Sequence, residues 1–159
     1  IIIDTNNFTS KTGVRTFEAA AFLRRCGADV TRVRKMFRSD MSEYKAKAET
    51  VRHAQLYHGF AISVCPAESI ESPTIVGAQA ANELLNINGV KASVVLTDYQ
   101  HKTYVSARSI DEVNVQVLME RLGGGGHMNM SGAQLECGVE EAIEIVKHTI
   151  DKLHEEGEF

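Results

Sequence analysis

Residues 115–136 read VQVLMERLGGGGHMNMSGAQLE, and this stretch is the most informative part of the chain. Before the glycines, apolar residues recur at the spacing of an amphipathic helix: Val115, Leu118, Met119 and Leu122. The run Gly123–Gly126 raises the conformational entropy of the unfolded chain, so it is expected only where the fold needs it. Glycine backbone N–H groups can surround an anion, and the ring of His127 can donate to a phosphate oxygen. The stretch therefore predicts a phosphate-binding loop between a helix and an extended segment near residues 133–136. A flexible connector is the alternative.

A strand and a hairpin are predicted upstream of this loop. Phe60–Cys65 is a strand-like run ended by Pro66, and Ser72-Pro73 begins a helix. Ala92–Asp98 and Thr103–Arg108 are predicted to form a hairpin around Tyr99–Lys102.

The second strand of this hairpin carries Ser106 and Arg108. Residues two apart on a strand project from one face, so these two side chains are expected to lie on the same side. The planar guanidinium suits phosphate, although an arginine on a strand is often an ordinary surface residue.

The first 55 residues are predicted to be mainly helical. Ile1–Ile3 is a short β-branched run, expected to be a strand, and Asp4 follows at its end. Metal ligands and catalytic groups often occupy that position in α/β folds, but Asp4 is equally suited to an Asx turn with Asn6. The predicted helices cover residues 16–26, a short segment capped by Asp29 or Thr31, and residues 39–53.

A domain boundary is expected near residues 52–59. Residues 1–55 are interpreted as the helical remnant of a larger α/β domain, and residues 56–159 as a compact α+β domain with a mixed sheet and a long C-terminal helix. Because the chain begins within a predicted buried strand, we expect it to be part of a longer protein.

Composition limits the functions to consider. With 43% hydrophobic and 24% charged residues, the chain has the balance of a soluble globular protein. No run approaches the roughly 18 apolar residues of a membrane helix. Cys26, Cys65 and Cys137 are widely spaced, which disfavours disulfides or a zinc site and favours a reducing cytoplasm. A net charge of −4 disfavours broad nucleic-acid binding. A basic stretch at residues 24–38 and an acidic one at 136–159 are most simply solvated helix faces.

Two blocks of residues resemble the DHH phosphoesterase family. The first is similar to the last motif of the DHH domain and comprises Asp4-Thr5, Phe8-Thr9, Thr12-Gly13 and Arg15–Ala20. The second is similar to the DHH-associated C-terminal domain and comprises Ser106–Ser109, Asn114-Val115, Gly123–His127 and Ala133–Leu135. The blocks occur in the family's order and span nearly the whole chain. Within the family, the chain is most similar to the membrane-anchored cyclic-di-AMP phosphodiesterases of bacteria.

The resemblance implies two domains that face each other across a cleft. It implies that the DHH domain holds two manganese ions on Asp and His ligands, which activate a water for attack on a phosphodiester. It makes Asp4 the last of these metal ligands. It assigns substrate binding to Ser106, Arg108, Gly124, Gly125, Gly126 and His127. The Asp-His-His triplet and the earlier metal ligands of the family are absent from this chain, so we expect it neither to bind both ions fully nor to hydrolyse substrate alone.

The expected function is therefore the substrate-binding C-terminal part of a manganese-dependent phosphodiesterase that converts cyclic di-AMP to pApA. One alternative is a phosphodiesterase or exonuclease of the same superfamily that acts on short oligonucleotides. Another is a non-catalytic nucleic-acid-binding module. The expected partners are the nucleotide, an upstream DHH region and a second copy of the chain. We expect this chain to be a cytoplasmic domain of a membrane-anchored parent protein and to make no direct contact with the membrane itself.

Overall fold

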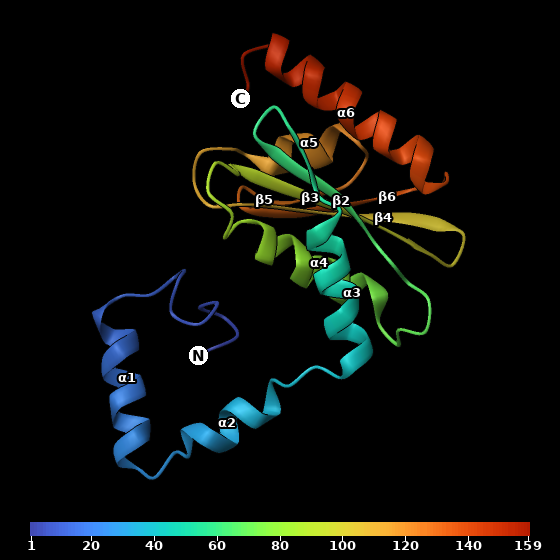
Figure 1. The fold of residues 1–159 in the computed structure, drawn as a ribbon. Helices are drawn as coiled ribbons and strands as arrows, with labels where there is room; N and C mark the ends of the chain where they lie inside the picture. The colour runs from blue at the N-terminus through green and yellow to red at the C-terminus, as the bar shows by residue number, and fades with distance from the viewer. The chain divides into compact units, whose positions relative to one another are not determined.

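Six strands between residues 55 and 135 form one mixed β-sheet in the computed structural model, which describes residues 1–159 (Figure 1). The chain divides into two compact units, unit 1 (Ile1–Ser39) and unit 2 (Asp40–Phe159), and the sheet belongs to unit 2. The elements in chain order are α1 (Val14–Arg25), α2 (Val30–Met36), α3 (Met41–Arg52), β1 (Gln55–Tyr57), β2 (Phe60–Cys65), α4 (Pro73–Leu84), β3 (Ala92–Tyr99), β4 (Lys102–Ser109), α5 (Val115–Arg121), β5 (Gly125–His127), β6 (Met130–Leu135) and α6 (Val139–Glu155). The expected α/β fold class with a mixed sheet is confirmed.

The strand order is β1-β2-β3-β4-β6-β5, and β2 with β3 is the parallel pair. A parallel pair needs a crossover connection, which α4 provides. The other neighbouring strands are antiparallel. The predicted hairpin is present as β3 and β4, joined by Gln100 and His101 with φ of 54° and 63°. Two successive positive φ values are what a type I′ hairpin turn requires.

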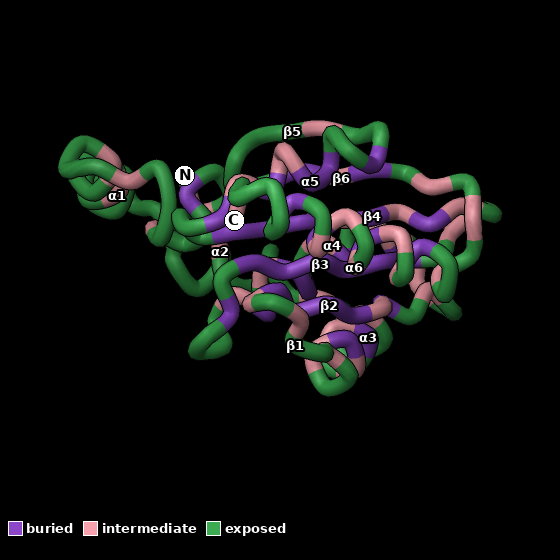
Figure 2. Tube along the Cα trace, turned by 90° about the horizontal axis from the view of Figure 1, so that it is seen from above, coloured by how far each residue is buried: buried purple, intermediate pink, exposed green.

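The two faces of the sheet pack against different helices. Successive strand residues point to opposite faces, so Val94 and Val105 enter one core while Val95 enters the other. The first core lies beneath α5 and α6, and we call this side the α5/α6 face. The second core lies beneath α3 and α4, on the α3/α4 face. Figure 2 shows the buried residues concentrated along β2, β3 and β4.

Helices α3 and α4 leave part of their own face uncovered. The core beneath them takes its strand residues from β2 and β3 only. On β6, Met130 is 54% exposed, whereas Ser131 and Ala133, which point to the opposite face, are buried. The α3/α4 face is therefore open over β6 and β5, beside β4. We call this region the open half-face.

The predicted strand at Ile1–Ile3 is wrong. These residues lie in turns, in which the Thr5 N–H donates to the Ile1 carbonyl at 3.0 Å and the Asn6 N–H to the Ile3 carbonyl at 3.2 Å. An extended segment needs a neighbouring strand to satisfy its backbone, and unit 1 contains none. Asp4 consequently lies in a turn and not at the end of a strand.

Helix α3 belongs to unit 2, so this unit begins before the boundary expected at residues 52–59. The helix packs on α4 and β2, and Ser63 Oγ donates to the Thr50 carbonyl at 2.6 Å. The buried Ala46 of α3 joins the core of the α3/α4 face. Residues 40–55 thus share the packing of unit 2. The expected division into family domains at residues 1–55 and 56–159 stays a prediction.

Aspartate side chains begin two of the helices. Asp29 Oδ1 accepts from the N–H groups of Thr31 and Arg32, so Asp29 caps α2 and Thr31 does not. The cap of α3 is Asp40, one residue after the expected position, and its Oδ1 accepts from the backbone N–H groups of Ser42 and Glu43. None of the six helices combines the length and the apolar composition that a bilayer crossing requires.

A chain shortened to residues 40–159 should unfold at nearly the same urea concentration as the full chain, because both apolar cores are built from residues of unit 2. A chain of residues 56–159 should lose roughly 3 kcal/mol or more, because it lacks Ala46 and leaves Ser63 without its acceptor. Urea denaturation followed by circular dichroism measures both effects. Equal midpoints for the two shortened chains would place α3 outside the folding unit.

Candidate functional site

The strand register brings the predicted site residues of unit 2 onto one face. Directly paired residues of neighbouring strands project to the same side of a sheet. Two rows cross β4, β6 and β5: Ser106–Gly132–Gly125 and Arg108–Met130–His127. Ser106, Arg108 and His127 therefore lie on the α3/α4 face, although nineteen positions separate Arg108 from His127 in the sequence. The Cα atoms of Arg108 and His127 are two strand spacings apart, about 9.6 Å. A long arginine side chain and an imidazole can meet one anion across that separation.

Arg108 is a buried cation without an acidic partner. Its residue is only 9% exposed, and it forms no ion pair. Nη1 donates to the carbonyl oxygens of Ala107 at 2.8 Å and Ser131 at 3.5 Å, while the buried Nε has no hydrogen-bond partner. Burial lowers the pKa of the Arg108 guanidinium, but an arginine remains charged at neutral pH. An uncompensated buried charge is costly, so this position favours the arrival of an anion.

Ser106 and His127 have side chains that are free for a ligand. The Ser106 side chain is partly buried, and its hydroxyl makes no hydrogen bond within the chain. His127 is exposed at the end of β5, and its ring likewise has no intramolecular partner. Ser106 is two residues from Arg108 on β4, which corresponds to about 7 Å along the strand. The shared face predicted for Ser106 and Arg108 is therefore present, and His127 lies on the same face, while the role of these residues in substrate binding stays a prediction.

The glycine run is not the free loop that the sequence suggested. Gly123 has φ of 78°, and its N–H donates to the Glu120 carbonyl, while the Gly124 N–H donates to the Met119 carbonyl at 2.8 Å. This pair of bonds is the Schellman motif that ends α5. Gly125, Gly126 and His127 then form the edge strand β5. Two of the four glycine N–H groups expected to surround an anion are thus occupied by the helix end.

Gly124 and Gly126 allow the backbone to press against β6. A Cβ on Gly124 would lie 2.6 Å from Ala133 Cα, and a Cβ on Gly126 would lie 2.6 Å from the Met130 carbonyl oxygen. Real Cβ atoms do not approach that closely, so these positions require glycine. Gly125 differs, because a Cβ there would meet nothing within 4 Å. It belongs to the row of Ser106 and leaves space above the open half-face.

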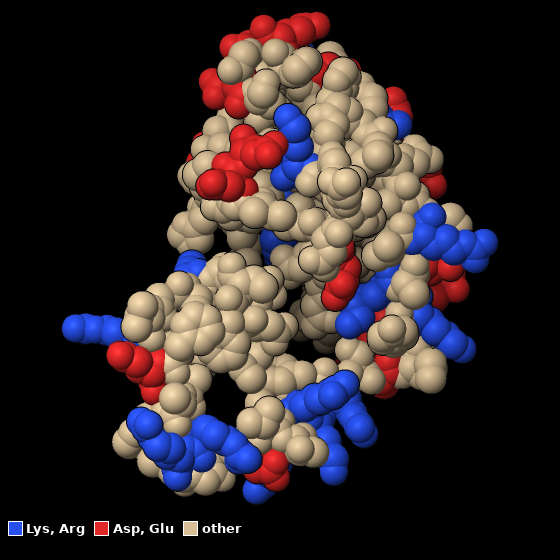
Figure 3. Space-filling view, turned by 60° about the vertical axis from the view of Figure 1, so that its left-hand side comes forward, with Lys and Arg blue, Asp and Glu red and all other residues tan.

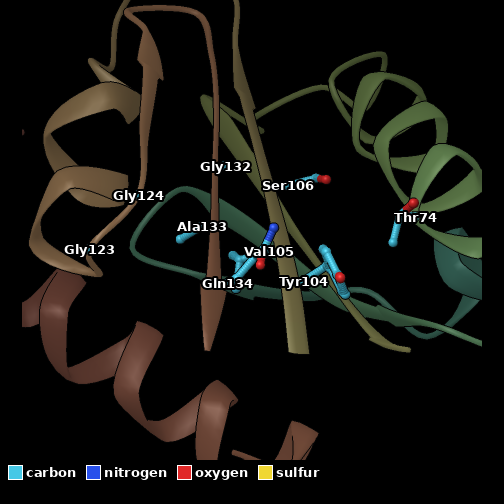
Figure 4. Close-up of a pocket in the computed structure, with 9 residues that line it drawn as sticks. All are labelled: Thr74, Tyr104, Val105, Ser106, Gly123, Gly124, Gly132, Ala133 and Gln134. Carbon is cyan, nitrogen blue, oxygen red and sulfur yellow. The ribbon is translucent and has the colours of Figure 1, made fainter. Parts of the chain in front are cut away.

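A pocket of about 440 Å³ lies beside these rows (Figure 4). Tyr104 and Ser106 extend from β4 toward the side on which Thr74 of α4 lies, and Gln134 contributes from β6. Sequence reasoning missed Thr74, Tyr104 and Gln134. Tyr104 could have been found, because it shares the period-two spacing of Ser106 and Arg108. Gln134 required the register of β4 with β6, and Thr74 required the packing of α4.

Asp4 is in unit 1, and its side chain is 84% exposed and lies 3.5 Å from the amino group of Ile1. The structure contains no group of three or more His, Cys, Asp or Glu side chains arranged to hold a metal. A two-metal centre needs several carboxylate or imidazole ligands. The residues of this chain do not by themselves fit such a centre, and the role of Asp4 as a manganese ligand stays a prediction.

Charged side chains gather in different places on the two units. Figure 3 shows Lys and Arg side chains where α1 ends and along α2, in unit 1. Acidic side chains lie along α6 of unit 2, whose first turn carries Glu140 and Glu141. In the two rows that cross β4, β6 and β5, Arg108 and His127 are the residues with basic side chains.

Residues 60–155 match the family model of the DHHA1 domain. The chain is 41% identical over 161 residues to the cyclic-di-AMP phosphodiesterase GdpP of Bacillus subtilis, covering 99% of this chain and 24% of that protein. It is 43% identical over 138 residues to the cyclic-di-AMP phosphodiesterase PdeA of Listeria monocytogenes, covering 86% of this chain and 21% of that protein. The chain thus spans less than a quarter of the length of these relatives. An exopolyphosphatase-related protein from Bacteroides fragilis has the same fold, with a TM-score of 0.85 and 21% identity over 96% of this chain and 47% of its own.

Gly124→Ala should lower the free energy of unfolding by roughly 1–3 kcal/mol, because the added methyl group has no space against Ala133. Gly125→Ala, at the next residue, is the matched control and should change stability by less than about 0.5 kcal/mol. Urea denaturation of both variants measures the difference. Equal losses in the two variants would contradict the close approach of Gly124 to β6.

Proposed function

The chain belongs to the DHHA1 domain family of the DHH phosphoesterases, and we propose that it is the substrate-holding part of a manganese-dependent phosphodiesterase that opens cyclic di-AMP to linear pApA. The observation that carries this proposal is the buried Arg108, which has no acidic partner and an unpaired Nε. The names of the relatives from Bacillus subtilis and Listeria monocytogenes supply the substrate class. Both are more than 40% identical to this chain over the aligned residues.

Arg108 is suited to hold a phosphodiester because its charge is already desolvated before the ligand arrives. The free-energy cost of burying the guanidinium is part of the free energy of folding, so it does not weaken ligand binding. An ion pair formed where water is largely excluded is stronger than one at an exposed surface. Nε is buried and lacks a partner, so a phosphate oxygen that reached it would accept a hydrogen bond from an otherwise unsatisfied donor. Binding would thus remove the unsatisfied polar atom of the unliganded protein.

Ser106, Gly125 and His127 would complete the phosphate site. Ser106 adds a hydroxyl beside Arg108, and His127 adds a ring N–H from the far side of the same row. The open space above Gly125 lets a phosphate come close to the sheet. Gly124 and Gly126 would act indirectly, by keeping β5 against β6 so that His127 stays in the row of Arg108.

The role supported for this chain is to bind and orient the substrate. Manganese ions would supply the activation of the attacking water, and such a centre would need ligands in addition to Asp4. The exposed carboxylate of Asp4 is free of other side chains and in this proposal is one of those ligands. No proton transfer or bond cleavage is assigned to a residue of unit 2.

Short oligonucleotides share the phosphodiester that Arg108 would hold, so a phosphodiesterase for such substrates is the second candidate. The single buried arginine favours either ligand over a long nucleic acid, which is held by many lysine and arginine contacts. Comparing cyclic di-AMP with pApA and with a ten-residue oligoadenylate separates the three functions. A strong salt dependence that grows with chain length would favour the nucleic-acid-binding module.

Arg108→Met should weaken binding of cyclic di-AMP to the 159-residue chain by about tenfold or more, because a charge-assisted hydrogen bond is lost. The same variant should unfold at an unchanged or higher temperature, because it removes a buried cation that has no acidic partner. Calorimetric titration and thermal melting measure the two effects.

The control for this variant is Arg121→Met, which breaks an exposed ion pair with Glu156 and should leave binding unchanged. His127→Ala should weaken binding in the same direction as Arg108→Met. Full affinity in the Arg108→Met protein, with its fold intact, would refute the proposed site.

Added manganese should not make the 159-residue chain hydrolyse cyclic di-AMP, because no group of three or more ligand side chains is assembled in it. Chromatographic detection of pApA after incubation with excess MnCl₂ tests this expectation. The cyclic-di-AMP phosphodiesterase GdpP of Bacillus subtilis, treated in the same way, is the positive control. Turnover by the 159-residue chain would mean that the metal ligands are complete within it.

A further inference from the structure

The pocket beside Ser106 has a chemical character different from that of the phosphate site. Its lining includes the hydroxyls of Thr74, Tyr104 and Ser106 and the amide of Gln134, and it includes no charged residue. None of these four side chains makes a hydrogen bond within the chain. The pocket therefore offers unpaired, neutral donors and acceptors, which suit an uncharged polar group better than a phosphate.

Tyr104 and Gln134 lie opposite each other on β4 and β6. Paired residues on neighbouring strands have Cβ atoms about 5 Å apart, so one flat ligand can contact both side chains. The Tyr104 ring is partly buried and is supported by Tyr99, with ring centroids 6.3 Å apart and planes tilted by 53°. A partly exposed aromatic ring of this kind is a surface on which a nucleobase can stack.

The strand row next to Tyr104 and Gln134 has little side-chain bulk. Ser106 pairs with Gly132, and Gly132 pairs with Gly125, so two of its three residues have no side chain. A planar ring can therefore approach the backbone of β6 and β5. The volume of about 440 Å³ lies in the range of pockets that hold small organic ligands.

The pocket and the phosphate site lie in line along β4. Tyr104, Ser106 and Arg108 follow one another on the same face at steps of about 7 Å. A ligand with a phosphate at Arg108 and a sugar near Ser106 would place its base near Tyr104. The order of chemical groups along the strand matches the order of phosphate, sugar and base in a nucleotide.

We propose that this pocket is the nucleobase subsite and that it selects adenine, with Tyr104 as the stacking surface and Gln134 as the reader of the base edge. This inference rests on the proposed function for the phosphate that accompanies the base. A glutamine amide presents one acceptor and one donor side by side, which match the N6 amino group and N7 of adenine. Guanine presents two acceptors, O6 and N7, at the same edge and is matched less well.

The test uses the ¹⁵N-labelled 159-residue chain and separate ligands for the two sites, observed by NMR chemical-shift titration. Adenosine, which has no phosphate, should shift the amide signals of residues 104–106 and 132–134. Inorganic phosphate should shift those of residues 106–108, 125 and 127, so that residue 106, which borders both sites, responds to either ligand. Adenosine 5′-monophosphate should shift both sets and bind more tightly than either ligand alone.

Two variants separate this inference from the proposed function. Tyr104→Leu should weaken adenosine about tenfold or more, and Gln134→Leu should abolish the preference for adenosine over guanosine. Both variants should keep the response to inorganic phosphate. Arg108→Met should lose the phosphate response and keep that to adenosine.

Tyr104→Phe retains the ring and should bind adenosine as the wild type does, which distinguishes stacking from a general loss of structure. Tyr44→Leu, an exposed tyrosine on α3, is the matched control and should have no effect. Unchanged adenosine affinity in Tyr104→Leu, or adenosine shifts located away from residues 104–106 and 132–134, would overturn the base subsite while leaving the phosphate site standing. If the wild-type chain responds to adenosine but not to inorganic phosphate, the proposed function is refuted and the base subsite is not.

Discussion

The close backbone contact of β5 with β6 is the constraint on which the site depends. It can form only because Gly124 and Gly126 lack side chains where Ala133 and the Met130 carbonyl lie. The same run of glycines ends α5, since the N–H groups of Gly123 and Gly124 satisfy the last carbonyls of that helix. The end of α5, the edge strand β5 and the β5–β6 hairpin are thus joined within a few residues. His127 is the last residue before the hairpin turn and lies in the row of Arg108.

The unequal covering of the two faces explains where a ligand can bind. Helices α5 and α6 cover one face with an apolar core that includes β3, β4 and β6. Helices α3 and α4 form their core with β2 and β3, which leaves the sheet open over the glycine-containing strands. Arg108 lies at the border between the covered and open parts. The Arg108–Met130–His127 row runs from this buried residue to an exposed imidazole.

Much of this architecture was predictable from local patterns. The hairpin of β3 and β4, helix α4 beginning at Pro73, and the long α6 follow from alternating or helical spacing of apolar residues. The wrong predictions concern segments whose structure depends on a neighbouring strand more than on the local preference of their own residues. Ile1–Ile3 has the composition of a strand but no neighbour in unit 1 with which to pair. Gly125–His127 has the composition of a loop but has β6 as a neighbour.

The candidate site was predictable to a similar extent. Period-two spacing placed Ser106 and Arg108 on one face, and the glycine run identified His127. The burial of Arg108 and its unpaired Nε depend on residues far away in the sequence, so no local pattern contains them. The same holds for the neutral pocket, whose walls come from α4, β4 and β6.

The lengths of the strands also bear on how copies of this chain can associate. The central strands β3 and β4 have eight residues each, whereas β1 and β5, at the two edges, have three each. A strand from another molecule could extend the hydrogen-bond ladder at either edge only along the three residues of β1 or of β5. Such tapering discourages the edge-to-edge growth that leads to aggregation. Any stable pairing of two copies is therefore expected to use helix or loop surfaces, which leaves the strand backbone at the glycine edge accessible to small molecules.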